Sequence, residues 1–208
     1  MVTPASFWDK AAAKYDRKTV KGPNYKARIE RSVQWVGPQA VVLDAGCAGG
    51  QITLDLAAHV RQITGIDISS RLITFAEARL AQQASENAVF KVASPDDPVL
   101  EPGSFDAITA YSLLHLVEDV PATLRRFYEL LRPGGQLIAE FPCREQIGLH
   151  VRLLIKLMQL VGKAPDVHLY RESQYEHMFT EAGFTVEEMK IYNPASLNTS
   201  VLAIRRGE

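Results

Sequence analysis

The 208-residue sequence predicts one α/β domain, with helices on both faces of a mostly parallel, doubly wound sheet. Between residues 41 and 142, short apolar segments rich in β-branched residues alternate with longer segments of helical periodicity. That alternation is typical of parallel strands joined by crossover helices. With 47% hydrophobic residues, the chain can fill one large core but is too short for two large domains.

The elements can be justified in chain order. The first strand, 41–44, is short and β-branched, and the helix near 50–60 carries Ile52, Leu56 and Val60 on one face. Four more strands are expected at 63–68, 89–92, 103–111 and from 136 to 142. Helices are expected at 70–84 and after Pro121, where Leu124, Phe127 and Leu131 form the buried face and Gly134-Gly135 ends the helix.

The C-terminal part predicts one more helix and two closing strands. A capping box at Ser173–Glu176 begins the helix, and Gly183 ends it. The strands near 184–192 and 200–205 bring the total to seven.

A glycine-rich turn links the first strand to the first helix. Gly46, Gly49 and Gly50 let backbone N–H groups and a helix N-terminus approach a ligand without a Cβ in the way. The dinucleotide spacing G-x-G-x-x-G is not met, because Ala48 and Gln51 stand at its second and third glycine positions. No Gly-Lys-Ser/Thr follows, so the turn is not a phosphate-binding P-loop.

The strand and turn, Val42 to Gly50, read Val-Leu-Asp-Ala-Gly-Cys-Ala-Gly-Gly. This pattern resembles the first motif of class I S-adenosylmethionine (SAM) dependent methyltransferases of the small-molecule, type 11 group. Further segments at Gly65–Ser69, Gly103–Asp106 and Leu130–Leu137 resemble later motifs of that family in the right order. The resemblance covers residues 40–142. It implies a Rossmann-like sheet of seven strands with an antiparallel C-terminal strand, SAM as donor, S-adenosylhomocysteine as product and no required metal.

The same resemblance implies where the cofactor lies. Open α/β sheets bind ligands outside the carboxyl ends of their strands, at the point where the strand order reverses. Asp67, about twenty residues beyond the glycine turn, is where a Rossmann-like unit places its ribose-binding acid. The expected cofactor-binding residues are Asp44, Gly46, Cys47, Gly50, Asp67, Ile68, Ser94, Pro95 and Tyr111.

Two positions depart from the family pattern. Ser94 stands where many relatives carry an aspartate that bonds the adenine amino group, and Asp96 or Asp97 could replace that acceptor from the same loop. Ala48 replaces a common glycine. If its φ is positive, we expect a cost of about 1 kcal/mol.

Methyl transfer from a sulfonium requires mainly alignment, so few catalytic side chains are expected. The candidates for a general base are His115, Tyr111, Tyr15, His150 and His168, of which we single out His115 and Tyr15 as catalytic. A histidine among leucines is also commonly a hydrogen-bonded structural residue. Tyr15 belongs to an N-terminal segment, about 1–36, that resembles the helices covering SAM in small-molecule methyltransferases, and it could equally be a packing residue.

An insertion at about 144–171 follows the fifth strand. Its central part, Ile147–Val161, is apolar except for a helical stripe of Arg152, Lys156 and Gln159. We expect a lid packed on the sheet edge, with an apolar-substrate cap shared with a dimer partner or a membrane surface as the alternative. Fifteen residues that include charges do not span a bilayer.

The overall charge bears on which partners the whole molecule attracts. A net charge of −1 and a pI near 6.5 give no whole-molecule attraction to nucleic acid or an anionic membrane. Met1–Asp9 lacks the pattern of a signal peptide, so we expect a cytoplasmic protein. Cys47 and Cys143 are expected to be free thiols, because their strands lie too far apart for a disulfide.

These features predict a SAM-dependent methyltransferase that acts on a small, partly apolar molecule, as a monomer or homodimer. The alternatives are a non-catalytic binding module and an RNA methyltransferase, the latter because residues 1–31 are rich in Lys and Arg. We expect no nucleic-acid partner, since no RNA-binding appendage is evident. The sequence Ala110-Tyr111-Ser112-Leu113 lacks the Asn/Asp-Pro-Pro-aromatic motif of many nucleobase and glutamine amino-methyltransferases.

Overall fold

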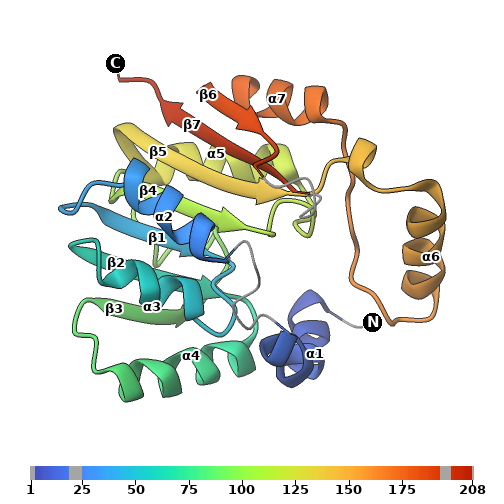
Figure 1. The fold of residues 1–208 in the computed structure, drawn as a ribbon, viewed down its shortest axis with the longest axis horizontal. Helices are drawn as coiled ribbons and strands as arrows, with labels where there is room; N and C mark the ends of the chain where they lie inside the picture. The colour runs from blue at the N-terminus through green and yellow to red at the C-terminus, as the bar shows by residue number, and fades with distance from the viewer. Residues whose placement is uncertain (1–2, 19–24, 193–197, 208) are drawn as a thin grey trace.

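Seven strands form one sheet in the order β3-β2-β1-β4-β5-β7-β6 in the computed structural model, which describes residues 3–18, 25–192 and 198–207 (Figure 1). The strands are β1 (Val41–Ala45), β2 (Gln62–Asp67), β3 (Ala88–Val92), β4 (Phe105–Tyr111), β5 (Leu131–Phe141), β6 (Phe184–Lys190) and β7 (Thr199–Arg205). The pairs among β1 to β5 are parallel, and β7 is antiparallel to both β5 and β6. The predicted fold class and the antiparallel C-terminal strand are confirmed.

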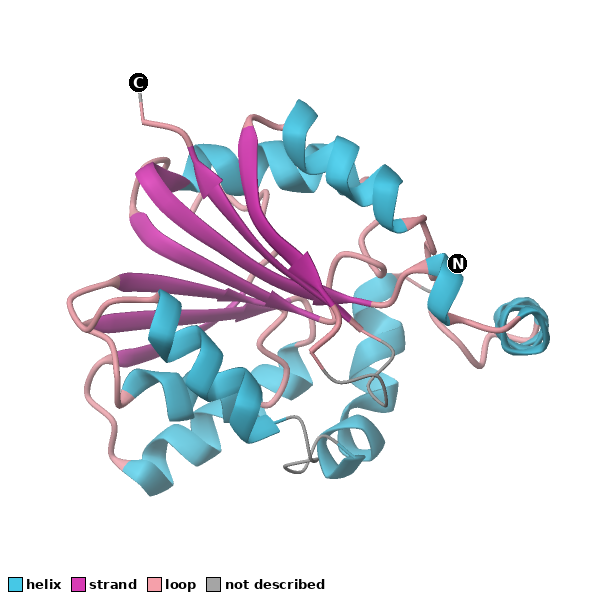
Figure 2. Cartoon of the chain, turned by 45° about the horizontal axis from the view of Figure 1, so that its top comes forward, coloured by secondary structure: helices cyan, strands magenta, loops and turns pink. Residues whose placement is uncertain are grey.

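Helices cover both faces of the sheet (Figure 2). On one face lie α2 (Tyr25–Trp35), α3 (Gln51–Ala57) and α4 (Ser70–Gln83). On the other lie α5 (Val120–Leu130) and α7 (Glu172–Glu181). Outside these layers, α1 (Pro4–Lys18) lies beyond the carboxyl ends of the strands next to α4, and α6 (Leu149–Leu160) follows a short 3-10 turn, Arg144–Gln146.

Each face has its own apolar core. The core under α5 and α7 contains the larger aromatic cluster, and its largest members are Phe127, Phe141, Tyr175, Phe179 and Phe184. The core under α3 and α4 is mainly aliphatic and includes Leu54, Leu56, Ile63, Ile73 and Phe90. These two buried layers hold the strands in a fixed register, so the loops at their carboxyl ends are presented from a rigid base.

The junction between α5 and β5 differs from the sequence prediction. The helix ends at Leu130, and Leu131 already pairs with Phe105 as a strand residue. Gly134-Gly135 therefore does not end the helix. A Cβ on Gly135 would lie 2.8 Å from the Arg132 oxygen within β5 and 3.1 Å from the Asp106 oxygen of β4, so the glycine allows the close approach at which β5 shifts its register on β4.

The start of α7 also differs from the prediction. The helix begins at Glu172, and the Arg171 N–H donates to Oε1 of Gln174 at 2.9 Å. Ser173 lies inside the first turn, so the predicted capping box at Ser173–Glu176 was wrong. The predicted end at Gly183 agrees with the structure, since this residue has φ +98° and follows the last helical turn.

The predicted lid, 144–171, does not pack on the sheet edge. Its helix α6 makes no extensive contact with another helix or strand among the described residues, and it stands away from the body of the molecule (Figures 1 and 2). Within the described part of the chain, no helix has both the length and the apolar character needed to cross a bilayer.

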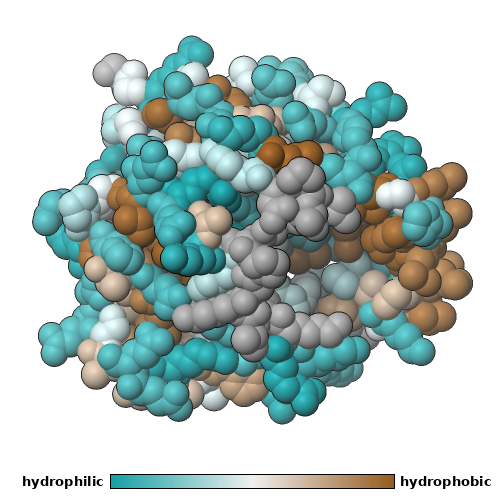
Figure 3. Space-filling model, in the orientation of Figure 1, coloured by the Kyte–Doolittle hydropathy of each residue, from teal (hydrophilic) through white to brown (hydrophobic). Residues whose placement is uncertain are grey.

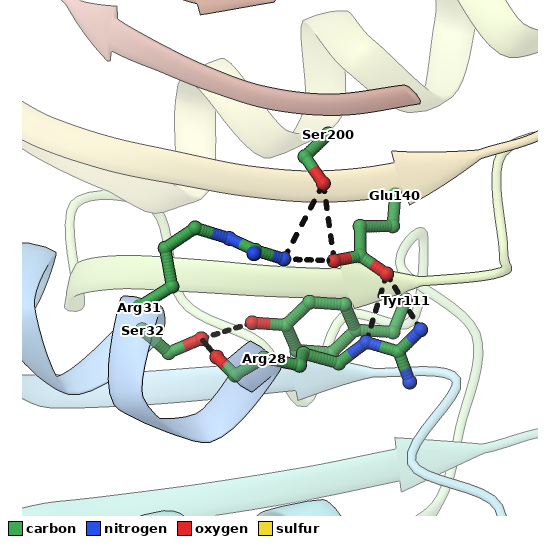
Figure 4. A network of polar contacts seen from close by, with 6 residues as sticks. All are labelled: Arg28, Arg31, Ser32, Tyr111, Glu140 and Ser200. Atoms are coloured by element: carbon green, nitrogen blue, oxygen red, sulfur yellow. Dashed lines mark hydrogen bonds and ion pairs between the residues drawn. The ribbon is translucent and has the colours of Figure 1, made fainter. Parts of the chain in front are cut away.

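A buried ion-pair network fixes α2 to the sheet (Figure 4). Glu140 on β5 is 5% exposed and accepts from Nε of Arg28 at 2.8 Å and from Nη2 of Arg31. The Oγ atom of Ser200 donates to the same carboxylate at 3.1 Å. A buried carboxylate is stable only when its oxygens are paired, and here two guanidinium groups and a hydroxyl satisfy them.

Glu140→Gln should lower the free energy of unfolding by roughly 2 to 4 kcal/mol, because two largely buried guanidinium groups lose their counter-charge. Urea denaturation measures the change. Glu30→Gln is the matched control, since Glu30 pairs with Lys26 on the exposed surface and its loss should cost under about 1 kcal/mol. Equal effects of the two variants would contradict the anchoring role of Glu140.

Ala48 in the glycine turn has φ +50°, as the sequence analysis anticipated. Ala48→Gly should therefore raise the free energy of unfolding by about 0.5 kcal/mol, the relief of left-handed strain minus the greater entropy of an unfolded glycine. Ala58→Gly is the control, because Ala58 is exposed with φ −64° and should lose stability instead. A loss of stability in Ala48→Gly would show that this backbone is not strained.

Candidate functional site

A cavity of about 810 Å³ lies at the carboxyl ends of the parallel strands, where the chain order reverses on the two sides of β1. Its floor comes from the loops that follow β1, β2, β3 and β4, and α1 forms a further wall. The predicted site residues that line it are Tyr15, Gly46, Asp67, Ile68, Ser94, Pro95 and Tyr111. The structure therefore brings together, at the expected edge, residues from five separate segments.

The glycine turn approaches the cavity through Gly46. Its N–H and that of Cys47 both donate to the carbonyl oxygen of Ile66, at 2.8 and 2.9 Å, which ties the turn to β2. Gly46 has φ +72°, and a Cβ there would lie 3.1 Å from the Leu113 side chain. Gly50, with φ +78°, instead packs against the ring of Phe90 and does not line the cavity.

Asp67 is the main carboxylate of the site. Its Oδ2 accepts from the Ala48 N–H at 3.1 Å, and its Oδ1 accepts from the Ser69 N–H at 2.8 Å. Burial raises the pKa of Asp67, and these two backbone donors oppose that rise. Two bonds leave lone pairs on the carboxylate free for further donors, so a ribose diol fits its remaining capacity.

Asp44 does not line the cavity. Its two oxygens accept from the hydroxyls of Thr53 at 2.6 Å and Thr109 at 2.7 Å, so it ties α3 to β1 and β4. Complete burial raises its pKa to about 6, despite these two hydrogen bonds. Cys47 is also buried outside the lining, and burial raises the pKa of its thiol. Both residues are buried and lie outside the cavity lining. Their direct contact with a cofactor stays a prediction.

The loop after β3 supplies the next wall. Ser94, Pro95 and Asp96 line the cavity, whereas Asp97 accepts from the Val99 N–H and does not. Arg126 on α5 donates to the carbonyl oxygens of Pro95 and Leu100, at 3.2 and 2.8 Å. No local sequence pattern predicts this role of Arg126, because a helix arginine gives no sign that it holds a distant loop.

Two acids of α1 fasten this helix over the glycine turn. Asp9 accepts from Oγ of Ser69 at 2.6 Å, and this hydrogen bond lowers its pKa. Asp16 accepts from Nη1 of Arg79 at 2.9 Å, and the same nitrogen donates to the Gly49 carbonyl at 2.6 Å. A Cβ on Gly49 would lie 2.0 Å from the Asp16 carboxylate, so only glycine leaves room for this ion pair.

The α1 helix then presents aromatic side chains to the cavity. Trp8 and Tyr15 line it, and their rings meet edge to face with centroids 5.3 Å apart. The covering role of the segment 1–36 stays a prediction, and residues 1–2 and 19–24 of it lie outside the described residues. Burial raises the pKa of Tyr15, and the charge of Asp67 adds to the rise. Its hydroxyl is therefore protonated at neutral pH and acts as a donor.

The ring of Tyr111 lines the cavity, but its hydroxyl is engaged elsewhere. The hydroxyl is hydrogen-bonded to Oγ of Ser32 on α2, and the guanidinium carbon of Arg28 lies 4.9 Å from the ring centroid (Figure 4). Burial raises the pKa of Tyr111 well above its usual range. Tyr111 can therefore contact a ligand with its ring only, and it is not available as a base.

His115 does not line the cavity. Its Nδ1 is buried and has no hydrogen-bond partner among the described residues, and desolvation lowers its pKa to about 4. His150 lies exposed on α6, and the His168 N–H donates to the His115 carbonyl. Of the base candidates, the structure brings only Tyr15 and the ring of Tyr111 to the cavity.

The charge of the lining suits a cation. Four acids line the cavity, Asp67, Asp96, Glu118 and Asp119, and no Lys, Arg or His does so among the described residues. Such a site favours the sulfonium of SAM and disfavours the pyrophosphate of a dinucleotide. The donor and acceptor groups present therefore fit the cofactor that the sequence motifs imply.

Comparison with known proteins supports the same cofactor. A family model described as a methyltransferase domain matches residues 16–189. A ubiquinone biosynthesis O-methyltransferase of Xanthomonas campestris pv. campestris is 39% identical over 101 residues, which are 48% of this chain and 42% of that protein. The match thus spans less than half the length of this curated relative.

Solved structures show the same fold. The putative methyltransferase in complex with the Trm112 activator, from Haloferax volcanii, superposes with a TM-score of 0.80 at 16% identity, covering 99% of both chains. A Burkholderia thailandensis 1,6-didemethyltoxoflavin-N1-methyltransferase, with its substrate and S-adenosylhomocysteine bound, gives 0.77 at 18% identity, covering 98% of this chain and 87% of that one. Because the family model matches most of the sequence, the chain belongs to the class I SAM-dependent methyltransferase family.

Proposed function

We propose that the protein transfers a methyl group from SAM to a small, neutral and partly apolar molecule. The observation that carries this proposal is the cavity at the sheet switch point, whose lining combines acidic residues with aromatic and aliphatic ones. Its volume of about 810 Å³ lies within the usual range of small-molecule sites, about 300–1,000 Å³.

The chemistry of the lining narrows the acceptor class. Besides its acids, the lining contains large apolar and aromatic side chains, namely Trp8, Leu113, Leu116 and Tyr170. Acceptors with a phosphate or carboxylate group gain no cationic partner from the described lining and are repelled by its acids. Neutral, partly apolar acceptors lose little on entering such a site.

Roles for individual residues follow from their positions. We assign Gly46 to the methionine portion of SAM, Asp67 and Ile68 to the ribose and adenine, and Ser94 and Pro95 to the adenine edge. All of them line the cavity. Asp96 lies beside Ser94 in the lining and is the carboxylate that can replace the aspartate missing at position 94.

Catalysis in this proposal depends on alignment. Bound SAM supplies an electrophilic methyl group. The aromatic walls of the cavity hold the acceptor in line with this methyl group, and α1 excludes water from the site. Tyr15, protonated at neutral pH, orients an acceptor heteroatom by donating a hydrogen bond. His115 has no position in the lining, so we assign it no direct catalytic contact.

The names of relatives agree with a small acceptor. One relative is named for ubiquinone biosynthesis and the other for 1,6-didemethyltoxoflavin, and both names refer to small molecules. These names describe those two proteins. The RNA alternative loses support, because Arg28 and Arg31 of the basic N-terminal segment form ion pairs with Glu140 inside the protein. Lys21 of that segment lies outside the described residues.

Calorimetric titration with S-adenosylhomocysteine tests the cofactor side of the proposal. We expect micromolar binding, and Asp67→Ala should weaken it by about 1 to 3 kcal/mol because a charge-assisted contact is lost. Asp97→Ala is the matched control from the neighbouring loop, since Asp97 does not line the cavity. Unchanged affinity in Asp67→Ala would remove this residue from the site.

The acceptor side is tested with labelled SAM and paired acceptors that differ only in a carboxylate. Transfer to the neutral member of each pair supports the proposal. Preference for the anionic member would contradict the acceptor class. Binding of S-adenosylhomocysteine without transfer to any acceptor would favour the non-catalytic module.

The lowered pKa of His115 makes a prediction about stability. The folded protein favours the neutral ring, so this residue's contribution is complete above pH 6.5 and is lost as the pH falls toward 4. In His115→Gln this loss, at most about 3 kcal/mol, should be absent. Asp44 acts in the opposite sense over the same range, so the difference between variant and wild type is the quantity to measure.

Urea denaturation between pH 4 and 8 gives that difference. The gap between wild type and His115→Gln should be constant from pH 7 to 8 and should shift in favour of the variant below pH 6. A constant gap over the whole range would show that His115 is not buried in its neutral form.

A further inference from the structure

The helix α6 presents its apolar side to solvent. Its exposed leucines include Leu149 (63% exposed), Leu153 (59%), Leu157 (59%) and Leu160 (84%). Figure 3 shows this region as the large hydrophobic area at the right of the molecule. Exposed apolar areas of this kind on otherwise polar proteins mark interaction surfaces.

The polar side of the same helix faces the returning part of its own excursion. Nε2 of Gln159 donates to the Pro165 carbonyl at 3.0 Å, and Nε of Arg152 is shielded from solvent. Ile155, on the same side, is only partly exposed. The amphipathic helix is thus oriented the opposite way from a helix that packs on its own core. Its apolar side is available to a partner.

The charges around α6 indicate what kind of partner fits. The helix contains no acid, and Lys156 and Lys163 are exposed beside the apolar side. Over residues 144–163 there are four Lys or Arg residues and one acid, Glu145, in a chain of net charge −1. A second copy docked through the same side would place like charges together. An apolar side bordered by cations matches an anionic lipid surface.

We propose that α6 docks in the plane of an anionic phospholipid bilayer, with its leucines in the acyl boundary and Lys156 and Lys163 at the headgroups. Its 12 residues extend about 18 Å, which suits a helix lying on the bilayer and not one crossing about 30 Å of hydrocarbon. This docking is independent of the proposed methyl transfer, since it depends only on the helix surface.

The position of α6 connects this surface to the cavity. The excursion that carries the helix is closed at its base, where the Arg144 N–H donates to the Tyr170 carbonyl at 2.8 Å. Tyr170 also lines the cavity. A docked α6 would therefore place the cavity wall at Tyr170 close to the lipid surface.

Flotation of the full chain with vesicles tests the docking directly. We expect binding to vesicles of equal parts phosphatidylglycerol and phosphatidylcholine, weaker binding to pure phosphatidylcholine, and a decrease with added salt. Leu153→Gln with Leu157→Gln should reduce binding to the anionic vesicles at least about ten-fold. Lys156→Gln with Lys163→Gln should reduce it roughly twenty- to thirty-fold.

A matched control changes two exposed apolar residues elsewhere. Val89→Gln with Val92→Gln alters β3, whose valines are 42% and 53% exposed, and should bind like wild type. Circular dichroism confirms that each variant is folded. No binding to anionic vesicles, equal binding to neutral ones, or full binding by the leucine variant would overturn the proposal. So would a dimer in sedimentation experiments that the leucine substitutions dissociate, because a second copy would then cover α6.

Discussion

The carboxylate of Asp67 holds three segments of this protein in one place. It accepts from the backbone of Ala48 in the glycine turn and of Ser69 at the start of α4. Ser69 in turn donates to Asp9 of α1. The turn, the helix that follows β2 and the covering helix are therefore positioned around one partly buried carboxylate. The same charge faces the cavity, so the group that organises the site is also placed to bind the cofactor.

Acidic and basic side chains near the cavity occupy different positions. Acids line the cavity, whereas the nearby guanidinium groups are turned toward partners in the protein. Arg79 pairs with Asp16, Arg126 with loop carbonyls, and Arg28 with Glu140. Arg79 and Arg126 stabilise the glycine turn and the loop after β3, and none of the three guanidinium groups lines the cavity. The potential that favours a sulfonium is thus a consequence of how the structural ion pairs are arranged.

Burial also decides which titratable groups can take part in chemistry. Asp44, Tyr111 and His115 each have a pKa shifted toward the neutral form by desolvation, and the polar atoms of Asp44 and Tyr111 are hydrogen-bonded inside the protein. Tyr15 is the candidate that keeps a place on the cavity wall. A fold that aligns two small molecules needs walls more than it needs a proton relay, and the lining is consistent with that requirement.

The sequence by itself determined the order of elements, the glycine turn, Asp67 and the loop after β3, because each is encoded by residues close together in the chain. The α5–β5 junction was mispredicted, since a glycine pair signals a turn and not the bulge that the neighbouring strand imposes. Only the tertiary structure decided the rest. Glu140 pairs with Arg28 across 112 positions, which no local pattern shows. The periodicity of α6 revealed an apolar side. Its outward orientation depends on how the polar side contacts the returning segment, as Gln159 does with Pro165.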